Sequence, residues 1–148
     1  MAFRFPLDSL LHAREAIERQ EELLLAAAQQ EAARIRAALE ECRDRQFALR
    51  RAQNEALGEA MSGAELQFTA ERQRSLRALE QQLSREHAAA ERRRAEQQAA
   101  YQRARTERRA IEALREQAAA AYHRGFARKE QQSLDETHLQ RRYHRGKC

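Results

Sequence analysis

Apolar residues recur every three or four positions in two long stretches of the chain, and each stretch predicts an amphipathic helix. In the first stretch we read an apolar line that shifts by one position after its third member: Leu10, Ile17, Leu24, then Leu25, Ala28, Ala32, Ile35, Leu39, Cys42, Gln46 and Leu49. The shift predicts a nearly straight N-terminal section with weak supercoiling. In the second stretch a strict seven-residue repeat begins at residue 76, with Leu76, Leu83, Ala90, Gln97, Ala104, Ile111 and Ala118 on one line and Leu79, Glu86, Arg93, Ala100, Glu107, Leu114 and Ala121 on the other.

Helix-breaking residues mark where these helices begin and end. Proline occurs once, at Pro6, and the four glycines are Gly58, Gly63, Gly125 and Gly146. Proline costs about 3 kcal/mol and glycine about 1 kcal/mol in a helix interior. We therefore expect a first arm over about 7–57, a turn over about 58–63, a second arm over about 64–125 and a tail over 126–148, all within one elongated coiled-coil unit.

The start of the first arm has two possible signals. Pro6 can occupy the first helical position, or Asp8 or Ser9 can cap the first free N–H groups.

The short turn favours an antiparallel hairpin over its main rival, a parallel coiled coil between two chains. Folding back at 61–63 pairs residues whose numbers sum to roughly 121. This register places Cys42 opposite Leu79, Leu10 opposite Ile111, and the alanines at 32–33 opposite those at 88–90. The predicted fold class is all-α, a long antiparallel two-helix coiled-coil hairpin.

The same register leaves the C-terminal part of the second arm without a partner helix. Met1 lies opposite about Ala120, so the tail overhangs and projects roughly 35–40 Å beyond the paired section if it is helical. Gly125 is a possible weak point at its base. The overhang carries bulky side chains that have no seam to fill, which suggests docking into another protein: Tyr122, Phe126, Leu134, Leu139 and Tyr143.

Composition and charge exclude several classes of protein. Charged residues make up 34% of the chain and aromatic residues 5%, which is typical of a coiled coil and too polar for a large core. Residues 1–57 hold 9 basic and 10 acidic side chains and residues 58–122 hold 12 and 10, whereas the tail from residue 123 holds 7 and 3. The basic run at 92–94 is flanked by glutamates and lacks aromatic neighbours, so we expect no nucleic-acid partner.

No catalytic, metal or cofactor motif is present. His123, His138, His144 and Cys148 lie near the C-terminus, but their spacing does not suit a zinc site. Cys42 falls on the predicted seam and is expected to be a small buried side chain. We expect no cofactor, no enzymatic activity, no membrane-spanning segment and an intracellular location.

Two segments carry a resemblance to a known family. The N-terminal run Phe3-Arg4-Phe5-Pro6-Leu7 precedes Leu10-Leu11 and an Ala/Glu-rich helix, and the run Arg128-Lys129-Glu130-Gln131-Gln132-Ser133-Leu134-Asp135-Glu136 lies near the C-terminus. Together they resemble the FliJ family of bacterial flagellar export proteins.

The resemblance implies a stalk that inserts into the ring of the flagellar export ATPase and contacts the membrane export gate protein and export chaperones. It implies a cytoplasmic protein at the inner face of the inner membrane. The residues implied for ring contact are Phe3, Phe5, Leu7, Phe126, Glu130, Gln131, Leu134, Asp135 and Glu136. Those suggested for gate contact are Phe47 and Phe68, which lie off the seam and are expected to be close across the hairpin.

Two alternative functions remain open. The first is the equivalent stalk of a virulence-type secretion system, which shares the architecture and differs in its partners. The second is a basic coiled coil that binds RNA or anionic membrane through its tail.

Overall fold

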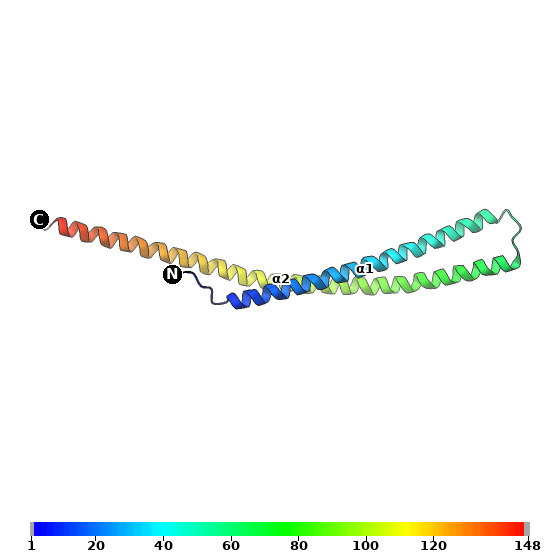
Figure 1. The fold of residues 1–148 in the computed structure, drawn as a ribbon, viewed down its shortest axis with the longest axis horizontal. Helices are drawn as coiled ribbons and strands as arrows, with labels where there is room; N and C mark the ends of the chain where they lie inside the picture. The colour runs from blue at the N-terminus through cyan, green and yellow to red at the C-terminus, as the bar shows by residue number, and fades with distance from the viewer. Residues whose placement is uncertain (1, 147–148) are drawn as a thin grey trace. The chain divides into compact units, whose positions relative to one another are not determined.

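Two long helices make up most of the described structure. The computed structural model describes residues 2–146, which contain α1 (Asp8–Ala56) and α2 (Gly63–Arg145) and no strand (Figure 1). The helices pack against each other as a hairpin, so the predicted all-α fold class is confirmed. By their contacts the residues group into two units, a hairpin unit (Arg19–Gln102) and a terminal unit (Met1–Glu18 with Arg103–Cys148).

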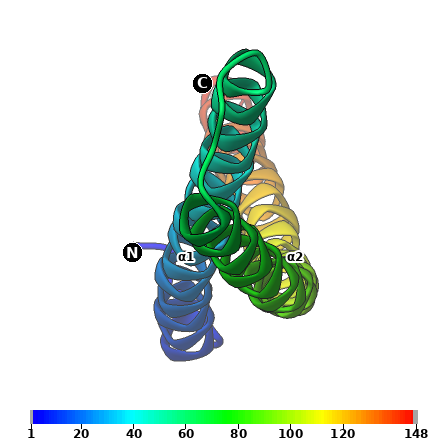
Figure 2. The same cartoon turned by 90° about the vertical axis from the view of Figure 1, so that its right-hand side faces the viewer.

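The turn of the hairpin unit ends in a side-chain cap that fixes the start of α2. The Ser62 N–H donates to the Glu65 carboxylate (2.8 Å), and the Glu65 N–H donates to the Ser62 hydroxyl (3.3 Å). This reciprocal pair is a capping box, which satisfies two N–H groups at the helix start. Figure 2 shows the loop joining the two helices from the turn end.

Cross-helix contacts establish the antiparallel register. Hydrogen bonds or ion pairs join Arg14 to Glu107, Glu31 to Arg93, Arg43 to Glu80 and Gln53 to Gln73. The numbers of the paired residues sum to between 121 and 126. The sequence-derived register of about 121 is therefore close to the observed one.

The core of the hairpin unit consists mainly of small and medium-sized side chains. Ala32, Ile35 and Ala90 form its buried cluster, and Ala90 is only 1% exposed. Alanine lets the two helices approach closely, but it contributes little apolar area per residue. Leu25, Leu39 and Cys42 extend the buried line along α1.

The buried line of α1 runs without the predicted shift. Leu10, Ile17 and Leu24 are 39–47% exposed, whereas Leu11 and Leu25 are buried, so the predicted start of the seam is wrong by one position. An unbroken seven-residue repeat runs through Leu11, Glu18, Leu25, Ala32, Leu39 and Gln46. Because this repeat already starts at Leu11, the seam continues through Leu25 in the same phase. The predicted one-residue shift between Leu24 and Leu25 is therefore absent.

On α2 one predicted line is correct and the other is displaced by one residue. The line from Leu76 to Ala118 is buried or half-buried throughout, but Leu79 and Leu114 are 40% and 48% exposed. The second line of the seam instead contains polar and aromatic residues: Gln73, Glu80, His87, Arg94, Tyr101, Arg108 and Tyr122. Accordingly, Cys42 lies at the backbone of Leu76, its Sγ 3.4 Å from the carbonyl oxygen, and not at Leu79.

A buried polar group interrupts the seam in the part of the hairpin unit nearer the turn. The Gln46 side chain is 8% exposed, and its amide nitrogen donates to the Leu76 carbonyl (3.1 Å) and the Glu80 carboxylate (2.9 Å). Arg43 donates to the same carboxylate (2.9 Å). These hydrogen bonds, led by those from Arg43 and Gln46, hold the pKa of Glu80 below its ordinary value. The Gln46 amide finds these hydrogen-bond partners in the observed alignment of the two helices, so it favours that register.

The first helix starts at a position that differs from both predicted signals. The first helical hydrogen bond runs from the Leu11 N–H to the Leu7 carbonyl (2.9 Å). Leu7 thus occupies the cap position, Pro6 precedes it, and Asp8 lies in the first turn, where its charge interacts favourably with the helix dipole.

Candidate protein-docking sites

The C-terminal section of α2 is an unaccompanied helix. Every described residue from 123 to 146 is exposed, and the helix continues through Gly125 to Arg145. Within the terminal unit, Phe3 contacts α2 at Tyr122, which is half-buried. The overhang predicted from the register is therefore present, without a break at the glycine.

Bulky apolar side chains lie on several sides of this helix. Phe126, Leu134, Leu139 and Tyr143 are 49–66% exposed. At about 100° per residue, Leu134 lies roughly 80° around the helix from Phe126, and Leu139 and Tyr143 lie roughly 220° and 260° around it. A helix resting in a shallow groove buries one stripe, whereas apolar residues on several sides suit a helix that another protein surrounds.

The residues before α1 fold against the base of this exposed helix. The Phe3 ring contacts the Tyr122 ring with centroids 5.6 Å apart and planes tilted by 52°. Phe3 and Phe5 are half-buried, and Leu7 is 39% exposed. A cavity of about 550 Å³ lies beside them, lined by Phe3, Arg4, Phe5, Pro6, Asp8, Ser9 and Arg115.

A second, apolar hollow lies where the overhang begins. It measures about 410 Å³ and is lined by Ala121, Tyr122, Gly125, Phe126 and Lys129. Gly125 leaves space there, since a Cβ atom at this position would meet nothing within 4 Å. Tyr122 thus links the N-terminal aromatic residues to the tail.

The predicted ring-contact residues fall into two separate groups. The first lies at the base of the exposed helix, where Phe3 contacts Tyr122, Phe126 lines the hollow beside Tyr122, and Phe5 and Leu7 follow Phe3 before α1 begins. The second lies further along the exposed helix and consists of Glu130, Gln131, Leu134, Asp135 and Glu136. Within that second group the Gln131 amide donates to the Asp135 carboxylate at 3.4 Å. Tyr122 was predicted to be one of the overhang side chains without a seam to fill, but it is half-buried, contacts Phe3 and belongs to the same seven-residue line as Arg108.

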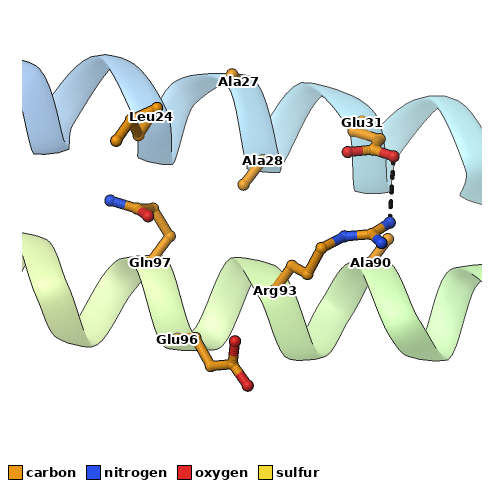
Figure 3. Close-up of a pocket in the computed structure, with 8 residues that line it drawn as sticks. All are labelled: Leu24, Ala27, Ala28, Glu31, Ala90, Arg93, Glu96 and Gln97. Atoms are coloured by element: carbon orange, nitrogen blue, oxygen red, sulfur yellow. Dashed lines mark hydrogen bonds and ion pairs between the residues drawn. The ribbon is translucent and has the colours of Figure 1, made fainter.

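The hairpin unit has a groove between α1 and α2 that the sequence reasoning did not predict. It measures about 400 Å³ and is shown in Figure 3, lined by Leu24, Ala27, Ala28, Glu31, Ala90, Arg93, Glu96 and Gln97. Arg93 reaches across to Glu31 at 3.2 Å, as the dashed line marks. Small side chains at Ala27, Ala28 and Ala90 leave this depression open.

Comparison with protein families matches residues 3–147 to the family described as flagellar FliJ protein. The chain belongs to the FliJ family. No curated protein and no solved structure matches it. Membership makes this chain a flagellar, type III export-related coiled-coil protein, and it is assigned to a family of structural export-apparatus proteins, not of enzymes.

The two phenylalanines suggested for gate contact are both exposed in this FliJ-family chain. Phe47 is 68% and Phe68 is 65% exposed, in the hairpin unit. The observed register places Phe68 opposite residues 53–58, which lie roughly 9–17 Å along the helix from Phe47. Within residues 2–146, no ring contact joins them.

Between residues 2 and 146, no cluster of three or more His, Cys, Asp or Glu side chains is arranged to hold a metal ion. Cys148 lies outside the described residues. Cys42 is a free thiol, 2% exposed, at its expected seam position. Neither α1 nor α2 contains a window apolar enough to cross a bilayer.

Proposed function

We propose that this FliJ-family chain is a non-enzymatic component of the flagellar export apparatus whose exposed C-terminal helix enters the central opening of the export ATPase ring. The observation that carries the proposal is the unaccompanied helix from residue 123 to Arg145 with apolar side chains on several sides. A ring lumen covers a helix from all sides and gives each of these side chains a partner.

The N-terminal aromatic residues contribute to the same docking end. Phe3 contacts Tyr122, which lines the hollow that contains Phe126, and Phe5 lines the neighbouring cavity together with Phe3. We assign ring contact to these residues and to Leu7, and to the group from Glu130 to Glu136 further along the helix. Net positive charge in the tail favours an acidic lining in the opening of the partner ring.

The hairpin unit then faces the other partners, which are the membrane export gate protein and the export chaperones. Phe47 and Phe68 are the proposed gate contacts, because exposed phenylalanines on a polar helix surface are suited to protein docking. In this arrangement the protein works in the cytoplasm, peripherally at the inner membrane, without a cofactor or nucleic-acid partner.

Co-purification with the export ATPase tests the proposal. A chain truncated after Tyr122 retains the paired helices and loses the exposed helix, so it should lose ATPase binding while its helicity per residue stays nearly constant. The double substitution Phe47→Gln/Phe68→Gln serves as the matched control, since it leaves the tail intact and should bind the ATPase normally. Undiminished binding of the truncated chain contradicts the proposal.

A further inference from the structure

Charged side chains dominate the pairing between the start of α1 and α2 in the terminal unit. Arg14 pairs with Glu107, and Arg108 pairs with both Glu18 and Glu112. The side chains of Glu18 and Arg108 are only 15% and 19% exposed, so this pair occupies the seam itself. Partial burial lowers the pKa of Arg108, but Glu18 and Glu112 outweigh it and raise that pKa overall.

Apolar burial in the same section is small. Leu11 and Ala104 are its two buried residues, and Ile111 is half-buried. In the hairpin unit, by contrast, the buried line includes Leu25, Ile35 and Leu39 in addition to alanines. Partly exposed ion pairs such as Arg14–Glu107 are weak and are screened by salt, and the less exposed Glu18–Arg108 pair is screened less. The hairpin unit also has cross-helix ion pairs, Arg43–Glu80 and Arg93–Glu31, but ion pairs carry a larger share of the pairing in the terminal unit, where less apolar surface is buried.

We propose that residues 2–18 form a releasable strap, which detaches from α2 when its ion pairs are broken and leaves α2 exposed from Arg103 onward. The structure favours release as one piece. The Phe3–Tyr122 contact at one end and the Glu18–Arg108 pair at the other bracket a section that contains one buried leucine.

Release lengthens the helix that is free to dock, a consequence that rests on the proposed function. The unaccompanied part of α2 grows from 23 residues (123–145) to 43 residues (103–145), which is from roughly 35 Å to roughly 65 Å. It also uncovers the line through Ala104, Ile111 and Ala118, which leads to Tyr122 and the tail. The strap would thus regulate how much of α2 a partner ring can enclose.

Amide hydrogen exchange of the free protein tests the strap directly. Raising NaCl from 0.05 M to 1 M shortens the screening length from above 10 Å to about 3 Å. We expect the protection of residues 11–18 against exchange to fall by roughly three- to tenfold, which corresponds to the loss of two or three ordinary ion pairs. The protection of residues 32–46 should change by less than twofold. Equal changes in both segments, or none in residues 11–18, overturn the proposal.

Substitution separates the ion pairs from general salt effects. Glu18→Gln should lower protection of residues 11–18 at low salt and reduce its salt dependence. Arg36→Gln is the matched control, because Arg36 pairs with Glu40 within α1 at an exposed position of the hairpin unit (3.1 Å). If Glu18→Gln and Arg36→Gln have the same effect on residues 11–18, the strap is not held by its ion pairs.

A reversible lock tests whether release accompanies docking. Leu11→Cys/Ile111→Cys, in a Cys42→Ala/Cys148→Ser background, places two thiols in register across the seam. The oxidised form should bind the export ATPase at least fivefold more weakly than the same protein after reduction. Equal binding by both forms contradicts release on docking. If neither form nor the unmodified chain binds the ATPase, the result counts against the proposed function. The hydrogen-exchange result then tests by itself whether residues 2–18 detach.

Discussion

Replacing Ala90 with leucine tests the phase of the hairpin seam. Ala90 is 1% exposed and contacts Ala32 and Ile35, which are 3% and 8% exposed. Leucine adds three carbon atoms to a side chain that Ala32 and Ile35 cover on the seam side. The groove beside Ala90 offers room only on its other side, so the larger side chain must push the helices apart or leave its preferred rotamer to turn into the groove.

The expected magnitude follows from the cost of overpacking. Ala90→Leu should lower the free energy of unfolding by about 1–3 kcal/mol. The matched control is Ala88→Leu, two residues away on an exposed face of the same helix. Its effect should stay within about 0.5 kcal/mol, as is usual for surface substitutions.

Urea unfolding followed by circular dichroism at 222 nm measures both variants. The midpoint should fall for Ala90→Leu with an unchanged slope, and it should barely move for Ala88→Leu. If Ala88→Leu is the more destabilising of the two, the seam runs through a different line of α2 and the described packing is wrong.

Three further substitutions address the cap, the tail and the buried polar group. Ser62→Ala removes the capping box and should cost about 1 kcal/mol in urea unfolding; an unchanged midpoint would show that the cap contributes nothing. In Gly125→Ala the added methyl group meets no neighbour, so the substitution should stabilise the surrounding helix by up to about 1 kcal/mol. Amide exchange should slow on both sides of residue 125, and faster exchange there would refute the continuous helix. Arg43 and Gln46 lower the pKa of Glu80, so its carboxylate stabilises the fold above its ordinary pKa near 4.5 and this stabilisation is lost as the pH falls through the lower folded value. Glu80→Gln should therefore lose less stability than the unmodified chain between pH 6 and pH 3, and parallel curves for the two proteins would contradict this.

The hairpin and its register were predictable because they depend on features that a sequence displays directly. Pro6, Gly58 and Gly63 are the residues that a long helix tolerates least, and they bracket α1 and the turn. A turn position fixes an antiparallel register within a few residues. The capping box is also marked in the sequence, by Ser62 followed three residues later by Glu65.

The phase of the seam was not predictable from the apolar residues alone. Leu10 and Leu24 stand next to leucines that take the seam positions, Leu11 and Leu25, and Ile17 stands next to Glu18, yet Leu10, Ile17 and Leu24 remain exposed. The observed phase lets Glu18 and Arg108 neutralise each other across the helices and keeps one repeat from Leu11 onward. Such cross-helix charge pairing becomes visible only when both helices are considered together.

The candidate docking residues were predictable only in part. The overhang follows from arithmetic on the register, and exposure of Phe126 and Leu134 follows from the absence of a partner helix. The contact of Phe3 with Tyr122 depends on how the residues before α1 turn, and no helical periodicity extends to them. The groove at Leu24 and Arg93 depends on the phase that sequence reasoning misassigned on both helices.

Site-specific photocross-linking to the assembled export ATPase ring tests the central claim most directly. A photoreactive benzoylphenylalanine replaces Phe126 in one protein and Phe68 in the control protein, and mass spectrometry locates the cross-links. Our account predicts that position 126 cross-links to residues lining the central opening of the ring and that position 68 does not. Cross-links from position 126 only to the outer surface of the ring, or equal lumen cross-linking from both positions, would contradict it.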